Sequence, residues 1–560
     1  MINQKNMREF SSIRRQDHLD RLQSDVFDIL IIGGGATGCG IALDAASRRL
    51  STALIEKRDF ASGTSSKSTK LIHGGLRYLK QLEFGLVRET GTERAIVHKL
   101  APHLVQPEKM LLPIIENGTY TKLAASVGVK VYDIMAGVRK SDRRKMLSKE
   151  DTLKKEPLLD ASVLKGSCYF AEYRTDDARL TIELIKSAAQ HGALALNYTT
   201  AQDFIYQDAK VKGVHAIDEL TGRVFTIRAK QVVSASGPWV DGLRSKNNSL
   251  SGKRLHLTKG VHIVLPHDKL PLRQSVYFDV PDGRMIFAIP RGRATYIGTT
   301  DTTYTASIDH VIATRKDADY LLAAVKHAFP SVNVSIDDVE SNWAGLRPLI
   351  HEDGKSPSEL SRKDEIFTSS SDLISIAGGK LTGYRKMGQR IVDLVIKKLD
   401  KDAVSCKTKT LALTQSPYQN VDEVNERIIE MKKRVQAIGL DEYYGWYLIT
   451  TYGEQSVMIV DRMSHFKDQA QVALVRAELW YCVHYEMVNR SVDFFIRRTG
   501  RLYFDIQSVK AYHQQVRLDL ANYLDWNQRI IDADRKELEE VIFDASHYYH
   551  EDIVMAEEVS

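Results

Sequence analysis

The sequence has little of what marks secreted, zinc-binding or membrane-spanning proteins. Among its 560 residues are only four cysteines, which lie far apart: Cys39, Cys168, Cys406 and Cys482. No CxxC pair and no histidine-rich metal spacing accompanies them, so we expect a reducing compartment and no structural zinc. Residues 1–23 are polar and lack the apolar core of a secretory signal, and the charge-free run over residues 29–43 is too short to span a bilayer. We therefore expect a cytoplasmic chain without transmembrane helices.

A strong imbalance of charge is also missing. The 78 lysines and arginines exceed the 72 aspartates and glutamates by a formal charge of only +6, which calls for no nucleic-acid partner. One basic amphipathic stretch, residues 123–146, can lie on an anionic membrane surface. A core helix with a solvated basic end explains the same pattern, so the sequence leaves both interpretations open.

What the chain does contain is a strand, a glycine turn and a helix in succession. The mainly apolar residues 27–32 lead into Gly33, Gly35 and Gly38, and residues 39–49 suit a helix. In a GxGxxG turn the first glycine permits the tight turn, the second lets the backbone approach a pyrophosphate, and the third lets the helix pack on the strand. The helix N-terminus adds unpaired amide hydrogens and a partial positive charge. The pattern predicts a dinucleotide-binding turn.

Glu56 narrows the choice of nucleotide. It follows a second strand-like run, residues 51–55, at the place where an acidic residue meets ribose hydroxyls in such folds. A carboxylate there favours an unphosphorylated ribose, as in FAD or NAD, whereas NADP would require a basic residue. Lys57 and Arg58 follow directly and weaken this interpretation slightly.

The rest of the chain predicts a mixed α/β protein of two or three domains, because 560 residues exceed the size of one hydrophobic core. Residues 84–160 look largely helical, a helix capped by residues 175–177 extends to His191, and short strands fill residues 195–299. That antiparallel set is a candidate substrate domain. Beyond Thr408 glycine becomes rare and the pattern turns helical, which predicts a C-terminal helical domain with helices near residues 421–438, 470–497 and 534–545.

A second glycine turn lies at residues 373–383 and leads into a helix through Lys398. The helix N-terminus and the amides of Gly378 and Gly379 can face a charged ligand group, although a simple βα connection has the same pattern. Two nucleotide-binding pieces so far apart in the sequence fit one long cofactor, so a flavin dinucleotide satisfies them better than NAD. The flavin then supplies the redox chemistry, while the protein orients the substrate and stabilises developing charge.

Seven short motifs lie one after another along the chain. They are GGGATG at residues 33–38, SGTSS at 62–66, HGGLRY at 73–78, YRTDDARL at 173–180, GPW at 237–239, GLRP at 345–348 and AGGKLT at 377–382. Together they strongly resemble the FAD-dependent glycerol-3-phosphate dehydrogenases, over nearly the whole chain from about residue 25. The resemblance implies oxidation of sn-glycerol 3-phosphate to dihydroxyacetone phosphate, with electrons passing from FAD to a membrane quinone.

The resemblance also implies an architecture: an FAD-binding Rossmann-like domain, a substrate domain built on an antiparallel sheet, and a C-terminal helical domain. The expected boundaries are 25–85 for the first part of the FAD-binding domain, 86–160 for a helical excursion, 161–235 for a return to the FAD-binding domain with strands, 236–370 for the substrate domain, 371–400 for a second return, and 401–560 for the C-terminal helical domain. The residues expected to hold FAD are Gly33, Gly35, Gly38, Glu56, Ser62, Thr64, Ser65, Gly237, Gly378, Gly379, Leu381 and Thr382.

Residues that suit a phosphorylated alcohol lie in or beside the same segments. Arg77, Arg347, Arg362 and Lys380 supply cations for a phosphate. His73 and His262 are the candidate bases, because an unperturbed imidazole titrates near neutral pH.

By resemblance we favour His73 as the base near the reactive hydroxyl, with Arg347 and Lys380 stabilising alkoxide character. Substrate binding is assigned to a second set: Arg77, Tyr78, His262 and Arg362. Ordinary structural roles remain open, since Arg77 can pair with Glu83, Tyr78 can pack in the core and Arg347 can be a loop cation.

Other functions stay open at this point. A glycerol-3-phosphate oxidase would give its electrons to oxygen and release hydrogen peroxide, but such oxidases typically carry an inserted segment with no obvious counterpart here. An amine or amino-acid oxidase could bind a carboxylate with Arg347. A non-catalytic nucleotide-binding or membrane-docking protein would leave residues 73–78 unexplained. We expect a flavoprotein at the inner face of the cell membrane, and the sequence leaves open the quinone, a covalent flavin link and a homodimer.

Overall fold

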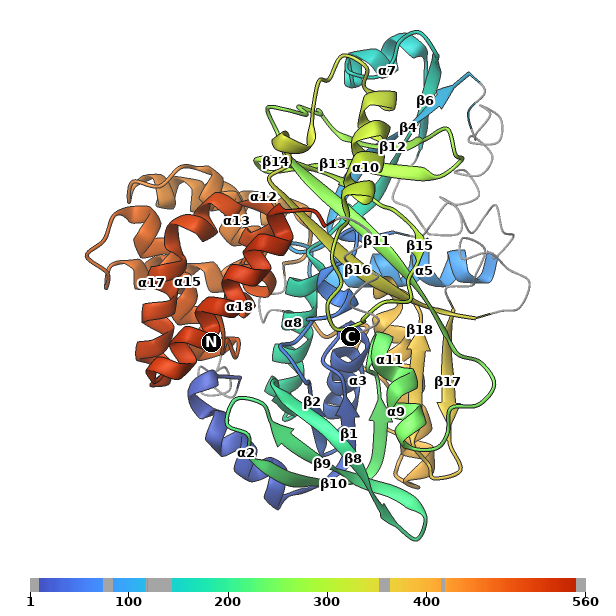
Figure 1. The fold of residues 1–560 in the computed structure, drawn as a ribbon, viewed down its shortest axis with the longest axis vertical. Coiled ribbons are helices and arrows are strands. Elements are labelled where there is room, and N and C mark those ends of the chain that lie inside the picture. Colours follow the sequence, from blue (N-terminus) through green and yellow to red (C-terminus); the bar gives the residue numbers. More distant parts are fainter. Residues whose placement is uncertain are drawn as a thin grey trace.

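A computed structural model describes residues 10–73, 84–116, 118, 144–351, 363–413 and 418–549. Within this part of the chain, eight strands form one β-sheet and ten form another. Figure 1 shows the eight-stranded sheet at the bottom, the ten-stranded sheet at the top and a group of C-terminal helices at the left, against both. The predicted combination of a Rossmann-like domain, an antiparallel sheet and a C-terminal helical domain is confirmed.

The eight-stranded sheet is the nucleotide-binding type predicted from the first glycine turn. Its main order is β17 (Asp364–Thr368), β18 (Ile374–Gly378), β10 (Val224–Ser234), β1 (Val26–Ile32), β2 (Thr52–Ile55) and β7 (Leu194–Leu196), and the hairpin of β8 (Thr199–Gln207) and β9 (Lys210–Asp218) extends from β10. The strands from β18 to β7 are parallel. β1 is buried almost throughout, as expected for a parallel strand covered on both faces.

The second glycine turn does return to this sheet. β18 ends at Gly378 and lies beside β10, and the short η6 (Leu381–Gly383) leads into α11 (Tyr384–Lys398). α3 (Ala36–Ser47), which follows the first glycine turn, contacts both α11 and α8 (Asp177–Gln190). The predicted cap of α8 is also present, because the side chain of Asp176 accepts a hydrogen bond from the amide of Arg179 at 3.0 Å.

The ten-stranded sheet is antiparallel except for one pair. Its main order is β15 (Thr302–Thr303), β11 (Leu255–Pro266), β14 (Ala294–Gly298), β13 (Met285–Arg291), β12 (Ser275–Asp279), β4 (Gln106–Ile115), β6 (Leu164–Arg174) and β3 (Leu71–Ile72), with β16 (Ser341–Ile350) on β11 and β5 (Lys145–Leu147) on β6. Only β4 and β12 run parallel among the pairs of this described sheet. Leu111 of β4 faces the side of α10 (Arg315–Ala328), whereas Met110 and Leu112 face the C-terminal helices.

The C-terminal helices follow the predicted pattern with one break. Their bounds are α12 (Val421–Gln436), α13 (Tyr443–Tyr452), η7 (Gly453–Gln455), α14 (Ser456–Met463), α15 (Ala470–Tyr485), the π-helix η8 (Asp493–Arg498), α16 (Arg501–Phe504), α17 (Ile506–Leu524) and α18 (Gln528–Ser546). The single helix expected over residues 470–497 was wrong. The chain breaks after Tyr485, and Met487 adopts a φ of 52°.

The expectation of a helical excursion over residues 86–160 was only partly correct. α5 (Phe84–Leu100) and α7 (Lys149–Lys155) are helical, but β4 and β5 lie between them. The sequence of β4 does not alternate between apolar and polar residues, because neighbours pair with this strand on both sides and both of its faces are covered. Its continuous apolar run therefore gave no strand signal.

Two of the expected domain boundaries differ from the sheets. β6, placed in the return to the FAD-binding domain, pairs with β4 in the ten-stranded sheet. β17, placed in the substrate domain, pairs with β18 in the eight-stranded sheet. Sheet membership depends on long-range pairing, which local strand propensity does not encode. The remaining described helices are η1 (Ser12–Arg14), α2 (Arg15–Ser24), η2 (Thr64–Ser66), η4 (Gly237–Trp239), α9 (Val240–Lys246) and η5 (Ile336–Asp338).

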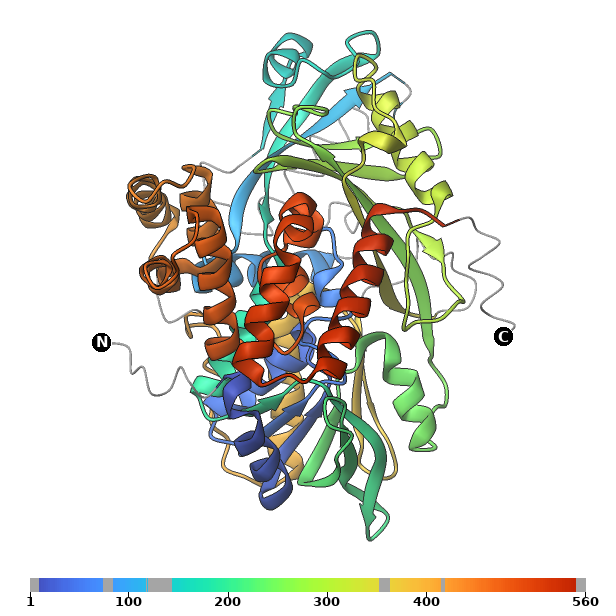
Figure 2. The same ribbon diagram turned by 60° about the vertical axis from the view of Figure 1, so that its left-hand side comes forward.

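The C-terminal helices meet the two sheets by different chemistry, in a region that Figure 2 brings to the front. Toward the ten-stranded sheet they share an apolar core that includes Phe170 and Trp343. Toward the eight-stranded sheet and α8 they form buried ion pairs, among them Glu486 with Arg179 and Arg498 with Asp59, with closest N–O distances of 2.6 and 2.8 Å. The C-terminal domain is therefore joined to both sheets.

Several absences hold for the described residues. The four cysteines are free, and no group of histidines, cysteines and carboxylates there could hold a metal ion. None of the helices in this part of the chain has both the length and the apolar character needed to span a bilayer. Of the basic amphipathic stretch at 123–146, residues 123–143 lie outside the described residues.

Candidate active site

The first glycine turn has the geometry that its sequence predicts. Gly33 has a φ of 115°, and a Cβ atom built there would lie 2.6 Å from the carbonyl oxygen of Ala235. A Cβ atom on Gly38 would overlap the carbonyl oxygen of Gly33, so the helix packs against the turn only because this position is glycine. Gly35 precedes α3 as its N-cap residue, and its side-chain position lies against the Ser65 hydroxyl.

Glu56 lies directly after β2 and beside this turn. One carboxylate oxygen accepts a hydrogen bond from the amide of Gly34 at 2.6 Å, and the other from the amide of Arg58 at 3.0 Å. Burial raises the pKa of Glu56, and these amide donors offset part of that rise. The carboxylate is thus fixed at the end of the strand where a ribose would lie in this fold.

The two cations after Glu56 are engaged by Asp309, which comes from the connection between β15 and α10. Lys57 Nζ lies 2.6 Å and Arg58 Nη2 3.3 Å from the same oxygen of Asp309. The indole nitrogen of Trp239 donates to that oxygen at 3.0 Å. Because Asp309 already balances the charges of Lys57 and Arg58, these two cations give no reason to expect a phosphorylated ribose. An unphosphorylated ribose beside Glu56 therefore remains the better interpretation.

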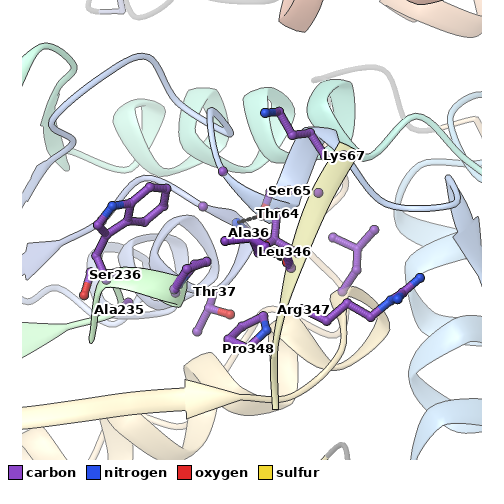
Figure 3. Close-up of a pocket in the computed structure, with 18 of the residues that line it drawn as sticks. Ala36, Thr37, Thr64, Ser65, Lys67, Ala235, Ser236, Leu346, Arg347 and Pro348 are labelled. Carbon is purple, nitrogen blue, oxygen red and sulfur yellow. Dashed lines mark hydrogen bonds between the residues drawn. The ribbon is translucent and has the colours of Figure 1, made fainter. Parts of the chain in front are cut away.

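The loop after Asp59 lies against the first glycine turn. The amide of Ala61 donates to the carbonyl of Gly34 at 3.0 Å, and the Ser65 hydroxyl accepts from the amide of Ala36 at 3.0 Å. Thr64 reaches the opposite sheet, where its hydroxyl donates to the carbonyl of Leu346 in β16 at 2.7 Å. Figure 3 shows Ser65, Thr64, Ala36 and Leu346 close together in the middle of the view.

The second glycine turn approaches from the far side. Gly378 and Gly379 have φ values of 73° and 82°, which side chains other than glycine rarely adopt. A Cβ atom on Gly378 would lie 2.7 Å from the carbonyl of Lys363. Lys380 and Leu381 follow immediately, and α11 begins after them, so a second helix N-terminus accompanies this turn.

These segments enclose one cavity of about 430 Å³. Nearly all predicted site residues within the described part of the chain line it: Gly33, Gly35, Glu56, Ser62, Thr64, Ser65, His73, Gly237, His262, Arg347, Gly378, Gly379, Lys380, Leu381 and Thr382. Gly38 instead packs behind the turn. Arg77, Tyr78 and Arg362 lie outside the described residues. Residues far apart in the sequence are therefore brought to one place.

His262 enters the cavity from β11 and is 1% exposed. Its Nε2 atom lies 3.0 Å from the Thr69 hydroxyl, and its ring stacks on Trp343 with centroids 4.6 Å apart and planes 10° apart. Burial lowers the pKa of His262 well below its ordinary value, and the nearby charges of Arg347 and Lys70 lower it further. The imidazole is therefore neutral at about pH 7, and its lowered pKa makes it a weak base.

Arg347 enters from β16, next to β11. Its Nη2 atom donates to the Thr299 hydroxyl at 2.8 Å, and its Nη1 atom donates to the carbonyl of Thr300 and the carboxylate of Asp301 at 3.1 and 3.0 Å. These contacts fix the guanidinium at the wall of the cavity. Figure 3 shows Leu346, Arg347 and Pro348 in succession along this strand. The loop-cation interpretation of Arg347 was wrong, since the residue lies within a strand.

His73 reaches the cavity from the end of β3. Its ring stands edge-on to Phe287 of β13, with centroids 6.1 Å apart. The side chain thus lies at the face of the ten-stranded sheet that also carries Tyr277 against Phe287. Both candidate bases come from this sheet, whereas the glycine turns come from the other.

Some residues of the cavity wall, and one that packs behind it, were not predicted from the sequence. Thr69 orients His262, Trp343 stacks on it, and Lys67 and Met387 complete the wall. Burial, together with the charges of Arg58 and Arg497, lowers the pKa of Lys67 to about 8. The hydroxyl-rich run at residues 62–66 could have been extended to Thr69, but no local signal marks Trp343, because its role arises only when β16 pairs with β11.

The fold and the cavity define a dinucleotide-dependent oxidoreductase of the flavoprotein type. Residues 28–380 match the family model of FAD dependent oxidoreductase, and residues 406–530 match that of the C-terminal domain of alpha-glycerophosphate oxidase. The chain is 47% identical over 545 residues to the aerobic glycerol-3-phosphate dehydrogenase of Bacillus subtilis, covering 96% of this chain and 98% of that protein. It is 48% identical over 548 residues to its namesake in Staphylococcus aureus, with the same coverage.

A solved structure agrees. That of the Bacillus halodurans glycerol-3-phosphate dehydrogenase complexed with FAD superposes with a TM-score of 0.83 at 43% identity, over 96% of this chain and 99% of that one. L-alpha-glycerophosphate oxidase from Mycoplasma pneumoniae shares only the fold, with a TM-score of 0.54 at 20% identity over 69% of this chain and 98% of that one. The chain belongs to the FAD-dependent oxidoreductase family and, within it, to the aerobic glycerol-3-phosphate dehydrogenases.

Proposed function

We propose that this protein oxidises sn-glycerol 3-phosphate to dihydroxyacetone phosphate with FAD as the redox cofactor, and that it passes the electrons to a membrane quinone. The observation that carries the proposal is the meeting of two glycine turns with His73, His262, Arg347 and Lys380 in one cavity. The glycine turns suit a dinucleotide, and the other four residues suit an alcohol that must lose both a hydride and a proton.

The residues present fit FAD. Gly33 and Gly38 leave no room for a Cβ atom, so the turn is tight and α3 packs closely on it. Gly35 lines the cavity as the N-cap residue of α3, where its backbone would meet the pyrophosphate. Glu56 would hold the ribose, and Ser62, Thr64, Ser65 and Gly237 would line the cofactor on the way to Gly378, Gly379, Leu381 and Thr382. When bound, the flavin supplies a site that accepts a hydride from the substrate carbon.

The protein groups would handle the proton and the charge. As the carbon–hydrogen bond breaks and its electron pair leaves, the hydroxyl proton passes to a base, which we assign to His73 with His262 as the alternative. Arg347 and Lys380 would stabilise the negative character of the substrate oxygen, because both cations line the same cavity. Arg77, Tyr78, Arg362 and His262 are proposed for substrate binding.

A test of the substrate uses the purified flavoprotein without oxygen. Titration with sn-glycerol 3-phosphate should bleach the flavin absorbance, and a panel of amino acids and amines should not. Reoxidation by a quinone analogue much faster than by oxygen supports the quinone as acceptor. Stoichiometric hydrogen peroxide during turnover would instead favour an oxidase, and a flavin unchanged by every reductant would refute the enzyme assignment.

The two candidate bases can be separated by pH. Burial and the charges of Arg347 and Lys70 lower the pKa of His262. His262 therefore stays neutral at pH values well below the ordinary pKa of a histidine. If His262 is the base, anaerobic flavin reduction should keep its rate as the pH falls below about 6.5. A rate that declines there, in a manner abolished by His73→Asn, supports His73. Equal reduction rates in the wild type and His73→Asn remove His73 from this role.

The membrane partner is a second part of the proposal. Quinones reside in lipid, so we propose peripheral docking on an anionic bilayer at the inner face of the cell membrane, and a homodimer stays a prediction. Flotation with vesicles containing anionic phospholipid, compared with neutral vesicles, tests the docking. Binding that is absent from both, or indifferent to lipid charge, would contradict an electrostatic docking surface.

A further inference from the structure

Asp59 lies at the start of the loop that lines the cavity, yet its carboxylate faces away toward the C-terminal domain. It is fully buried. Arg498 donates to both of its oxygens, Nη1 at 2.8 Å and Nη2 at 2.9 Å, in the parallel arrangement that fixes a carboxylate most firmly. Arg497 Nε and Asn197 Nδ2 complete the set at 2.5 and 2.9 Å. The C-terminal domain thus supplies three of the four hydrogen bonds to Asp59.

The backbone carries this attachment directly to the cavity. The carbonyl of Asp59 accepts from the amide of Ser62 at 3.1 Å. Ala61, with a φ of 62°, donates its amide to Gly34 in the first glycine turn. Ser62 and Thr64 then line the cavity, with Gly63 and Ser65 beside them. A shift of Asp59 would therefore move the hydroxyl residues and the contact with the glycine turn together.

Arg497 and Arg498 are themselves held by hydrogen bonds to other residues of the C-terminal domain. Both belong to η8, a π-helix, a rare element that occurs frequently at functional sites. Arg497 donates to Asp493 at 2.6 Å, and the Tyr198 hydroxyl donates to the same oxygen at 2.6 Å. Arg498 donates to the carbonyl of Glu486 through Nε at 3.0 Å and Nη2 at 2.8 Å. Since these groups are buried, water cannot replace a lost partner.

We propose that Arg497 and Arg498 are positioning residues for FAD, so that docking of the C-terminal domain and binding of the cofactor stabilise each other. The hydrogen bonds of Arg497 and Arg498 to Asp59, here called the clamp, fix the loop 59–66 against the first glycine turn in the conformation that the cofactor requires. Coupling of this kind is reciprocal, so bound FAD must also stabilise η8 against opening. The inference concerns cofactor binding alone and does not depend on which substrate is oxidised.

The test measures FAD affinity of the full-length apoprotein by quenching of flavin fluorescence. Arg498→Lys keeps the charge but cannot donate to both oxygens of Asp59, and we expect it to raise the Kd for FAD about tenfold. Arg501→Lys is the matched control. Arg501 is equally buried in the same domain, but it pairs with Glu478 at 2.6 Å, within that domain. The control should change the Kd for FAD less than about twofold.

A second measurement needs no variant. Hydrogen exchange of the η8 amides in the wild type should slow by at least about fivefold when FAD binds, while exchange in α12 stays unchanged. A changed FAD absorbance spectrum in Arg498→Lys, absent from Arg501→Lys, would add a signature of an altered cofactor environment. The proposal is overturned if both variants bind FAD like the wild type, if both weaken it equally, or if η8 exchanges at the same rate with and without FAD.

Discussion

The C-terminal helices touch the ten-stranded sheet through apolar side chains and the eight-stranded sheet through buried charges. The apolar contact is non-directional, so its strength depends on buried area and on filling of space. The charged contact requires that each donor meet its acceptor, because an unpaired buried charge is costly. We infer that the apolar contact provides most of the binding energy between the C-terminal helices and the rest of the molecule. The charged contact instead fixes the position of the loop 59–66 beside the cavity.

The largest expected effect is that of Glu486→Gln. Glu486 is fully buried and accepts from Arg179 at 2.6 and 2.8 Å and from Lys186 at 2.8 Å. The shape of the side chain is kept, but Arg179 and Lys186 lose one of the two buried carboxylates they share and keep only Glu183. The free energy of unfolding should therefore fall by about 3–5 kcal/mol in urea denaturation. Glu430→Gln, at an exposed pair with Arg427, should cost no more than about 1 kcal/mol. Equal losses in both variants would contradict the contrast.

Acid should weaken the charged contact selectively. Burial alone would raise the pKa of Asp59 and of Glu486, but Arg498 and Arg497 hold the pKa of Asp59 below its ordinary value, and Arg179 and Lys186 do so for Glu486. Between the ordinary and the lowered pKa values, the unfolded chain therefore binds more protons than the folded protein. The stability that both carboxylates contribute is fully present above about pH 4.5 and is lost as the pH falls through the lowered pKa values.

Urea denaturation at a series of pH values checks this. The free energy of unfolding should decrease below about pH 4.5, and the decrease should be shallower in Glu486→Gln, which lacks one of the titrating groups. Stability that rises on acidification, or a slope unaffected by the substitution, would be inconsistent with ionised carboxylates at the contact.

A conservative change at the apolar contact should be tolerated far better. Phe170 of β6 is 2% exposed and packs in the core shared with the C-terminal helices. Phe170→Leu keeps an apolar side chain of slightly smaller volume, so we expect a loss of about 1–1.5 kcal/mol and no change in the Kd for FAD. Urea denaturation and flavin fluorescence measure the two quantities. A loss of unfolding free energy as large as that of Glu486→Gln would show that the apolar contact is as sensitive to substitution as the charged one.

The smallest effect is expected at a charged contact that is not buried. The side chain of Asp309 is 50% exposed, although it holds Lys57, Arg58 and Trp239 beside the cavity. Because exposed pairs contribute little, Asp309→Asn should weaken FAD binding by only about 0.2–1 kcal/mol, seen as faster FAD release in stopped-flow fluorescence. Asp319→Asn, at an exposed pair with Arg315 on α10, should leave release unchanged. A large effect of Asp309→Asn would show that burial is not what separates the two kinds of charged contact.

Local sequence determined the parts of the site that rest on backbone conformation. Gly33 and Gly38 were identified because a turn with positive φ and a helix packed on its own turn both exclude a Cβ atom, and this requirement is written in a few adjacent residues. Glu56 could be found in the same way, from its place after a strand. The return at Gly378 and the C-terminal helices were also visible in short-range patterns.

Tertiary structure decided what depends on pairing between distant segments. β4 and β6 join the ten-stranded sheet although their residues gave no sign of it, and Trp343 stacks on His262 only because β16 lies beside β11. The clamp of Asp59 by Arg497 and Arg498 joins residues more than 400 positions apart. The energy of such contacts comes from burial and directed hydrogen bonds, which exist only once the chain has folded, so no local pattern announces them.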